Sequence, residues 1–180
     1  MKTKFHEAII PRLFFTSDQH FSHRRIIEYE KRPFAGVDVM NEELIHRWNT
    51  VVPENGIVIC AGDFSFSKAS KFTDHLNGTI HLVQGTHDHH AAHDRERAFA
   101  SVSDILYLAV GEQFIVVSHC PFESWERMHY GSWHIHGHTH GHARKVHNRM
   151  DVGIDVPGCT YAPWTYNEVK NMMEALDVPE

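Results

Sequence analysis

Residues 57–63 read IVICAGD, a fully apolar run that ends in a glycine and an aspartate. A short apolar run bounded by turn residues is typical of a strand buried on both faces, as in a parallel sheet. The turn residues Asn55 and Gly56 precede it, and a helical pattern follows at 67–76. We therefore predict a buried strand over 57–61 whose carboxyl end presents Asp63 to a functional site.

The same alternation of strand and helix continues on both sides of this stretch. Strands are predicted at 12–16 and 79–84, and further helices at 24–31, 41–51 and 91–100. Asn41 is the expected N-cap of the helix at 41–51, because Glu42 and Glu43 then fall in its first turn. Alternating strands and helices imply parallel strands joined by crossover helices.

Beyond residue 100 the pattern changes to a succession of strands. Residues 105–110 and 114–117 flank Gly111 and Glu112 and predict a hairpin, with more strands at 133–138 and 146–156 and a closing helix at 169–176. Asp151 and Asp155 fall on the last of these strands, where we expect solvated carboxylates rather than carboxylates that orient a ligand histidine. There is no repeat or linker, so we expect one α/β domain over residues 1–180, with two packed mixed sheets.

Composition narrows the class of protein. A net charge of −6 disfavours a broad nucleic-acid surface, although Arg24-Arg25 and Lys31-Arg32 are basic spots that could meet a single phosphate. Three widely spaced cysteines (Cys60, Cys120 and Cys159) indicate free thiols in a reducing compartment. No segment resembles a signal peptide or a membrane span, so we expect a soluble cytoplasmic protein without a membrane partner.

Five predicted strands each end in a polar cluster. In order, these are Asp18-Gln19-His20, Gly62-Asp63, Gly85-Thr86-His87-Asp88, Ser118-His119 and Gly137-His138-Thr139-His140. Sites in such sheets form beyond the carboxyl ends of the strands, and a mixture of carboxylates and imidazoles suits zinc, manganese or iron rather than calcium. With 18 histidines in the chain, a single His-x-His match means little, so the inference depends on the ordered set.

Taken together, these clusters resemble the signature of the calcineurin-like metallophosphoesterase superfamily, and residues 16–34 and 149–156 resemble its small bacterial and phage branch. The resemblance spans Asp18 to His140 and implies a four-layer α/β/β/α sandwich. It also implies hydrolysis of phosphomonoesters or phosphodiesters by a hydroxide that two divalent ions (Mn, Fe or Zn) activate. The substrate would be a small molecule, a nucleotide or a nucleic-acid end.

Carried over residue by residue, the resemblance also implies roles. Asp18, His20 and His140 would hold one metal, and His119 and His138 the other, with Asp63 bridging the pair. His87 would act beside the leaving oxygen as a general acid or electrostatic stabiliser, which makes His87 and Asp63 the implied catalytic residues.

The chain departs from the family pattern at Thr86, where the family has an asparagine whose amide oxygen binds the second metal. Three explanations stay open: a weak or empty second site, compensation by His89, His90 or Asp88, or a substituted variant of an asparagine-bearing parent. The alternative function is therefore a metal-binding module with weak or lost catalysis.

Overall fold

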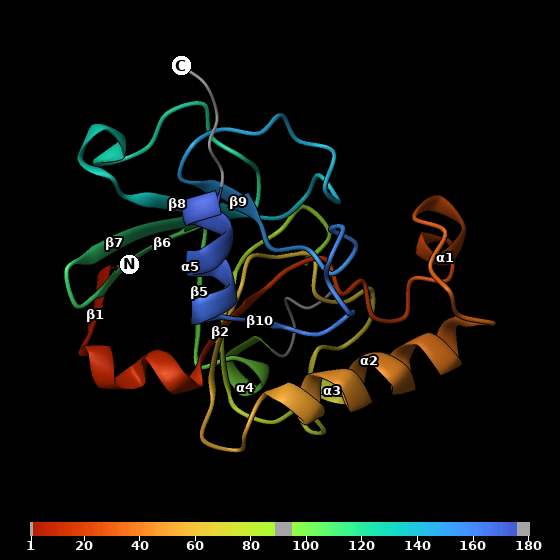
Figure 1. Cartoon of the computed structure of the whole chain (residues 1–180). Helices are drawn as coiled ribbons and strands as arrows, with labels where there is room; N and C mark the ends of the chain where they lie inside the picture. The colour runs from red at the N-terminus through yellow and green to blue at the C-terminus, as the bar shows by residue number, and fades with distance from the viewer. Residues whose placement is uncertain (1, 89–94, 176–180) are drawn as a thin grey trace.

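The computed structural model describes residues 2–88 and 95–175, which form two five-stranded sheets (Figure 1). The first sheet has the order β10-β2-β3-β4-β5, and its four strands from β2 to β5 are parallel. Their bounds are Leu13–Thr16 for β2, Ile57–Cys60 for β3, Thr79–Val83 for β4 and Ser101–Ser103 for β5. Strand β10 (Trp164–Thr165) is antiparallel to β2, which makes this sheet mixed.

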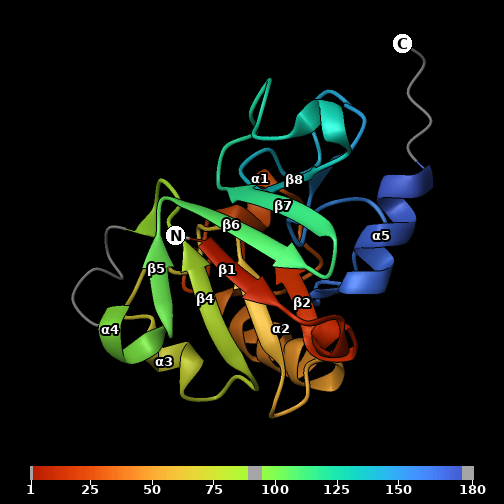
Figure 2. The same cartoon turned by 90° about the vertical axis from the view of Figure 1, so that its left-hand side faces the viewer.

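The second sheet has the order β1-β6-β7-β8-β9 and is also mixed. Figure 2 shows its strands β1, β6, β7 and β8 side by side. Its centre is the predicted hairpin, in which β6 and β7 pair antiparallel around Gly111. Strands β8 and β9 continue the sheet parallel to β7, and β1 pairs parallel with β6. The bounds are Lys2–Phe5 for β1, Ile105–Val110 for β6, Gln113–Ser118 for β7, Trp133–His136 for β8 and Arg149–Asp151 for β9.

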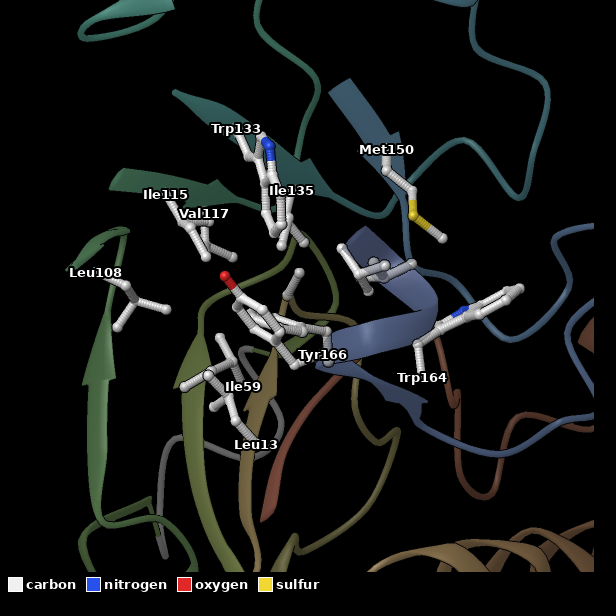
Figure 3. Packing of buried hydrophobic residues seen from close by; sticks show 14 of the residues in the cluster. Leu13, Ile59, Leu108, Ile115, Val117, Trp133, Ile135, Met150, Trp164 and Tyr166 are labelled. Atoms are coloured by element: carbon white, nitrogen blue, oxygen red, sulfur yellow. The ribbon is translucent and has the colours of Figure 1, made fainter. Parts of the chain in front are cut away.

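The two sheets face each other across a common apolar core (Figure 3). Alternate residues of each strand point inward, so Leu13 and Ile59 of the first sheet meet Leu108, Ile115 and Ile135 of the second. Helix α5 (Tyr166–Ala175) contributes its apolar face to the same core. Each fully buried aliphatic side chain contributes about 1.5–3 kcal/mol of transfer free energy, which makes this core the main source of cohesion between the sheets.

The outer face of the first sheet is covered by helices. Leu44 and Trp48 of α2 (Val37–Val51) share a second apolar cluster with Phe14, Val58 and Leu82 of the sheet. The shorter helices are α1 (Ile26–Tyr29), α3 (Ser70–Thr73) and α4 (Arg95–Ala98), and 3-10 turns lie at Glu7–Arg12 (η1) and Met128–Tyr130 (η3).

The outer face of the second sheet carries aromatic side chains from the segment 120–132. Phe122 stacks on His134 of β8 with ring centroids 5.1 Å apart, and Trp125 lies 5.2 Å from the same ring. His134 also accepts a hydrogen bond from the Phe122 backbone N–H. These contacts hold the segment that follows His119 against the sheet.

The predicted α/β sandwich with two packed mixed sheets is confirmed, but several boundaries differ. Helix α2 begins at Val37 with Gly36 as its N-cap, so the prediction of Asn41 as a cap was wrong. Asn41 instead lies inside the helix and accepts a hydrogen bond from the Ser22 backbone N–H. The helix expected at 67–76 is a single turn, and the strand expected at 146–156 is only β9.

Some short elements have no counterpart among the predicted ones. The short strands β1, β5 and β10 were not predicted, and residues 91–94 of the helix expected at 91–100 lie outside the described residues. Cys60, Cys120 and Cys159 are free thiols, as predicted. Within residues 2–88 and 95–175, every helix is too short or too polar to cross a bilayer.

Candidate metal centre

The predicted metal ligands converge into two groups at the carboxyl ends of the strands. We call Asp18, His20 and His140 the His20 cluster, and Asp63, His119 and His138 the His119 cluster. In each cluster, one ligand atom from every residue lies within 4.8 Å of the others. The loops after β2, β3, β7 and β8 thus bring together residues that are up to 122 positions apart in the sequence, from Asp18 to His140.

Asp63 lies between the two clusters. Its Oδ2 is 3.7 Å from Nε2 of His20 and 3.4 Å from Nε2 of His119. Its Oδ1 faces the other way and accepts a hydrogen bond of 2.8 Å from the backbone N–H of His87. A single carboxylate oxygen therefore faces both clusters.

Five of the six cluster residues have left-handed backbone conformations. The φ angles are 60° at Asp18, 51° at His20, 53° at Asp63, 69° at His138 and 47° at His140. For residues other than glycine this region costs about 1–3 kcal/mol each and persists only where surrounding contacts impose it. Here the loops brace each other, since the backbone N–H of His20 donates to the carbonyl of Asp63 at 3.0 Å.

Gly62 and Gly137 allow these loops to approach closely. Gly62 has a φ of 101°, and a Cβ atom there would lie 2.7 Å from the Nδ1 of His119. A Cβ atom on Gly137 would collide with the side chains of Ser17 and Asp18. Both positions need a residue without a side chain.

Asp88 supports the His119 cluster through the backbone. Its carboxylate is fully buried and accepts hydrogen bonds from the N–H groups of Asp63, Phe64 and Gly85, at 2.9, 2.8 and 2.7 Å. Both oxygens are therefore used to join the loops after β3 and β4. This geometry makes Asp88 a brace for Asp63 rather than a substitute ligand, and His89 and His90 lie outside the described residues.

Asp151 and Asp155 are not the solvated carboxylates expected from the sequence. Asp151 accepts hydrogen bonds from the Thr139 hydroxyl at 2.6 Å and the Gly141 N–H at 3.0 Å, which shapes the loop that carries His138 and His140. Asp155 accepts a hydrogen bond of 2.8 Å from Nδ1 of His140. Asp155 thus orients a ligand histidine, a role that local sequence pattern cannot reveal because it does not show that these loops meet.

The donor set fits divalent cations. Among the described residues, both ring nitrogens of His20 and the Nε2 of His119 are buried without a hydrogen-bond partner. His119 donates from Nδ1 to the carbonyl of Ala61 at 2.8 Å, which turns the lone pair of Nε2 toward Asp63. Its 3.4 Å separation from Oδ2 suits two ligands of one ion with bonds of about 2.0–2.2 Å.

The electrostatics of the centre favour the uptake of positive charge. Burial raises the pKa of Asp18 to about 7, and burial lowers the pKa of His20 to about 3. Burial alone would lower the pKa of His119, but the carboxylates of Asp63 and Asp18 raise it to about 9. Protons and metal cations would therefore compete for the same carboxylates and ring nitrogens.

Thr86 and His87 form the exposed rim of the centre. The Thr86 hydroxyl is 3.5 Å from Oδ2 of Asp63, and Nε2 of His87, whose side chain is 52% exposed, is 4.0 Å from the same oxygen. Phe66 packs between His87 and His23, with ring centroids 4.9 and 4.0 Å away. The two residues at the rim are thus beside the clusters but open to solvent.

Comparison with known proteins places the chain among relatives that share nearly its whole length. No model of a protein family matches it. The Gene 66 protein of Mycobacterium phage L5 is 29% identical over 182 aligned residues, covering 81% of this chain and 87% of that protein. The uncharacterized protein MJ1445 of Methanocaldococcus jannaschii is 30% identical over 173 aligned residues, covering 91% of this chain and 92% of that protein.

Solved structures agree with the architecture. The crystal structure of AQ665, a protein of unknown function from Aquifex aeolicus, superposes on 89% of this chain and 98% of that one, with a TM-score of 0.69 and 19% identity. A Vps29 single mutant from Entamoeba histolytica reaches a TM-score of only 0.41 at 17% identity, a likeness too weak to support an argument. AQ665 therefore shares the fold of this protein. The 30% identity to MJ1445, over nearly all of both of those chains, shows that this protein belongs to the family of MJ1445 from Methanocaldococcus jannaschii.

Proposed function

We propose that the protein is a metal-dependent phosphoester hydrolase of the calcineurin-like type, working as a single domain on a pair of divalent cations. The observation that carries this proposal is the position of Asp63 Oδ2, within 3.4–3.7 Å of a ring nitrogen from each cluster. One carboxylate oxygen shared by two ligand groups is the arrangement that a two-metal hydrolase needs.

In this proposal each cluster holds one cation, and Asp63 is common to both. Asp18, His20 and His140 would hold one ion, and His119 and His138 the other. When bound, the cations would polarise the phosphoryl oxygens and lower the pKa of a water molecule toward neutrality. Manganese, iron and zinc all suit this mixture of oxygen and nitrogen donors.

His87 is the residue that we assign to the leaving group. Its exposed side chain is near Asp63 without belonging to either cluster, so its ring nitrogen is available to a substrate oxygen. Donation of a proton or a hydrogen bond there would stabilise the charge that develops as the ester bond breaks. The exposure of His87 and His138 also suits bulky substrates, such as a nucleotide or a nucleic-acid end.

The alternative is a metal-binding module with weak or lost catalysis, and one observation favours it. Thr86, at the position where an asparagine ligand is expected, is an exposed residue whose hydroxyl is 3.5 Å from Oδ2 of Asp63. A threonine hydroxyl is a shorter and poorer ligand than an amide oxygen, so the second ion would be held less firmly.

Hydrolysis assays on metal-loaded protein distinguish the two. The protein would be loaded with Mn²⁺ and assayed with p-nitrophenyl phosphate and bis-p-nitrophenyl phosphate, with bound metal measured on the same sample. We expect turnover of at least one ester, abolished in Asp63→Asn and reduced to a smaller extent in His87→Ala, because p-nitrophenolate leaves without needing a proton. Full metal loading without hydrolysis of these and a wider set of phosphoesters would establish the binding module instead.

A further inference from the structure

Arg32 is a buried cation in the loop after α1, and all five of its N–H donors have acceptors. The guanidinium pairs with both oxygens of Asp155 through Nε and Nη2, at 2.8 and 2.7 Å. Nη2 also donates to the carbonyl of Asp18 at 2.8 Å, and Nη1 donates to the carbonyl of Gln19 at 2.9 Å and to the sulfur of Met40 at 3.4 Å. With a side chain that is 0% exposed, Arg32 has no donor left for a phosphate.

This geometry overturns the expectation that Lys31 and Arg32 form a basic spot for one phosphate. A phosphate-binding arginine presents free N–H groups to solvent or to a pocket. The guanidinium of Arg32 instead faces the backbone of the loop that carries Asp18 and His20. Its role has to be sought inside the protein.

The contacts of Arg32 reach every residue of the His20 cluster. Arg32 donates hydrogen bonds to the carbonyl oxygens of Asp18 and Gln19. The carbonyl of Gln19 belongs to the peptide group that joins Gln19 to His20, so this bond also restrains the backbone of His20. Both cluster residues have left-handed backbones, so these hydrogen bonds act where the chain needs external support.

Asp155 extends the same network to His140. Its Oδ2 accepts hydrogen bonds from Arg32 and from Nδ1 of His140, at 2.7 and 2.8 Å, and its side chain is 5% exposed. A carboxylate on one imidazole nitrogen fixes the tautomer and orientation of the ring and leaves the other nitrogen for a metal ion. No arginine of the described chain hydrogen-bonds in this way to the His119 cluster.

We propose that Arg32 and Asp155 are positioning residues that preorganise the His20 cluster, so that this cluster binds its cation more tightly than the His119 cluster does. The inference depends on the proposed function only in assigning cations to the two clusters. The ion pair carries no net charge, so it orders the ligands without strongly repelling a divalent cation. Preorganised ligands bind more tightly because less conformational freedom is lost on binding.

The test is a Co²⁺ titration followed by calorimetry and by visible absorption of the bound ion, which needs no turnover. Wild-type protein should show two unequal steps, the tighter one absent in His140→Ala and the weaker one absent in His138→Ala. In Arg32→Lys and Asp155→Asn the tighter step should weaken about 10- to 100-fold, while the other changes less than about twofold. Arg97→Lys is the matched control, because Arg97 is exposed and pairs with the exposed carboxylate of Asp74.

Thermal unfolding of the metal-free variants separates positioning from loss of structure. Asp155→Asn keeps the size of the side chain and carries the test if Arg32→Lys does not fold. The inference is overturned if both steps weaken equally, or if neither changes. Two unequal steps in wild type, the tighter one weakened in both variants, without any phosphoester hydrolysis would refute the proposed function alone, whereas absence of Co²⁺ binding would refute both.

Discussion

The two halves of the candidate metal centre use the same kinds of ligand but differ in their support. In the His20 cluster, Asp18 and His20 are buried and His140 is largely buried. Arg32 donates to the carbonyls of Asp18 and Gln19, the latter adjacent to His20, and Asp155 joins Arg32 to His140. In the His119 cluster, His138 is exposed. Each cluster has one aspartate and two histidines, so the ligand types alone do not determine metal affinity. The surrounding residues also matter, because they determine how rigidly the ligands are held.

The two clusters also differ in their exposure to solvent. The well-supported cluster is on the buried side, and the less supported cluster shares the exposed rim with Thr86 and His87. Under the proposed function, substrate would arrive from the rim and meet the more weakly held cation first.

Asp63→Asn should remove the contrast by damaging both clusters. The amide keeps the shape of the side chain but loses the negative charge that faces both ring nitrogens, so paired binding of cations should fail. We expect kcat/KM for the better p-nitrophenyl substrate to fall by at least ~10³-fold, about 4 kcal/mol of transition-state stabilisation. Asp74→Asn, which changes an exposed carboxylate paired with Arg97, is the matched control. Loss of only one of the two bound cations would show that Asp63 belongs to one cluster alone.

His87→Ala should separate catalysis from metal binding. His87 belongs to neither cluster, so both Co²⁺ steps should persist with unchanged affinity. Loss of a group that protonates or stabilises the leaving oxygen should lower kcat by ~10²- to 10³-fold. A substrate with a very acidic leaving group should be affected least, because it needs no proton. An equal loss for good and poor leaving groups would contradict the role assigned to His87.

The pH dependence of metal binding should differ between the clusters. The pKa of His119 is raised to about 9, so below that pH a cation must displace a proton from this ring. Affinity of the His119 cluster should therefore rise with pH, by up to about tenfold per unit, until it levels off near pH 9. In the His20 cluster, His20, whose pKa is lowered to about 3, imposes no such cost near neutrality, and Asp18 imposes one below about pH 7. Burial lowers the pKa of His140, but its hydrogen bond to Asp155 raises it above the ordinary value, so this ring adds a proton cost to the same cluster. Calorimetric Co²⁺ titrations from pH 6 to 9 measure both curves, and a weaker step that is flat above pH 7 would contradict this assignment.

The sequence predicted those parts of the molecule that local pattern can encode. The strand at 57–61 was visible because a parallel strand buried on both faces is a continuous apolar run. The glycines and polar residues at the strand ends located the site, and the family resemblance divided the ligands. Strand β5 was missed because it has three half-buried residues and no apolar pattern.

What the sequence could not reveal are contacts between distant segments. Arg32 and Asp155 are 123 positions apart in the sequence. No local pattern indicates that Arg32, which precedes a proline, pairs with Asp155, which follows β9. Asn41 was taken for a helix cap from propensity, whereas the tertiary structure uses its side chain to hold Ser22 beside the His20 loop. The left-handed backbones of the ligands were equally hidden, because aspartate and histidine adopt them only when the fold imposes them.

Thr86→Asn is expected to have the smallest effect and to reduce the difference in metal affinity between the two clusters. An asparagine amide oxygen reaches further than a threonine hydroxyl and is a better neutral ligand beside Asp63. The weaker Co²⁺ step should tighten by about 3- to 10-fold and turnover should rise at limiting metal, while the tighter step stays the same. Thr86→Val, which keeps the branching and removes the hydroxyl, shows whether the present threonine contributes at all. If Asn and Val variants both titrate like the wild type, position 86 plays no part in metal binding, and the weaker hold of the His119 cluster follows from the exposure of His138 and the lack of a buried ion pair.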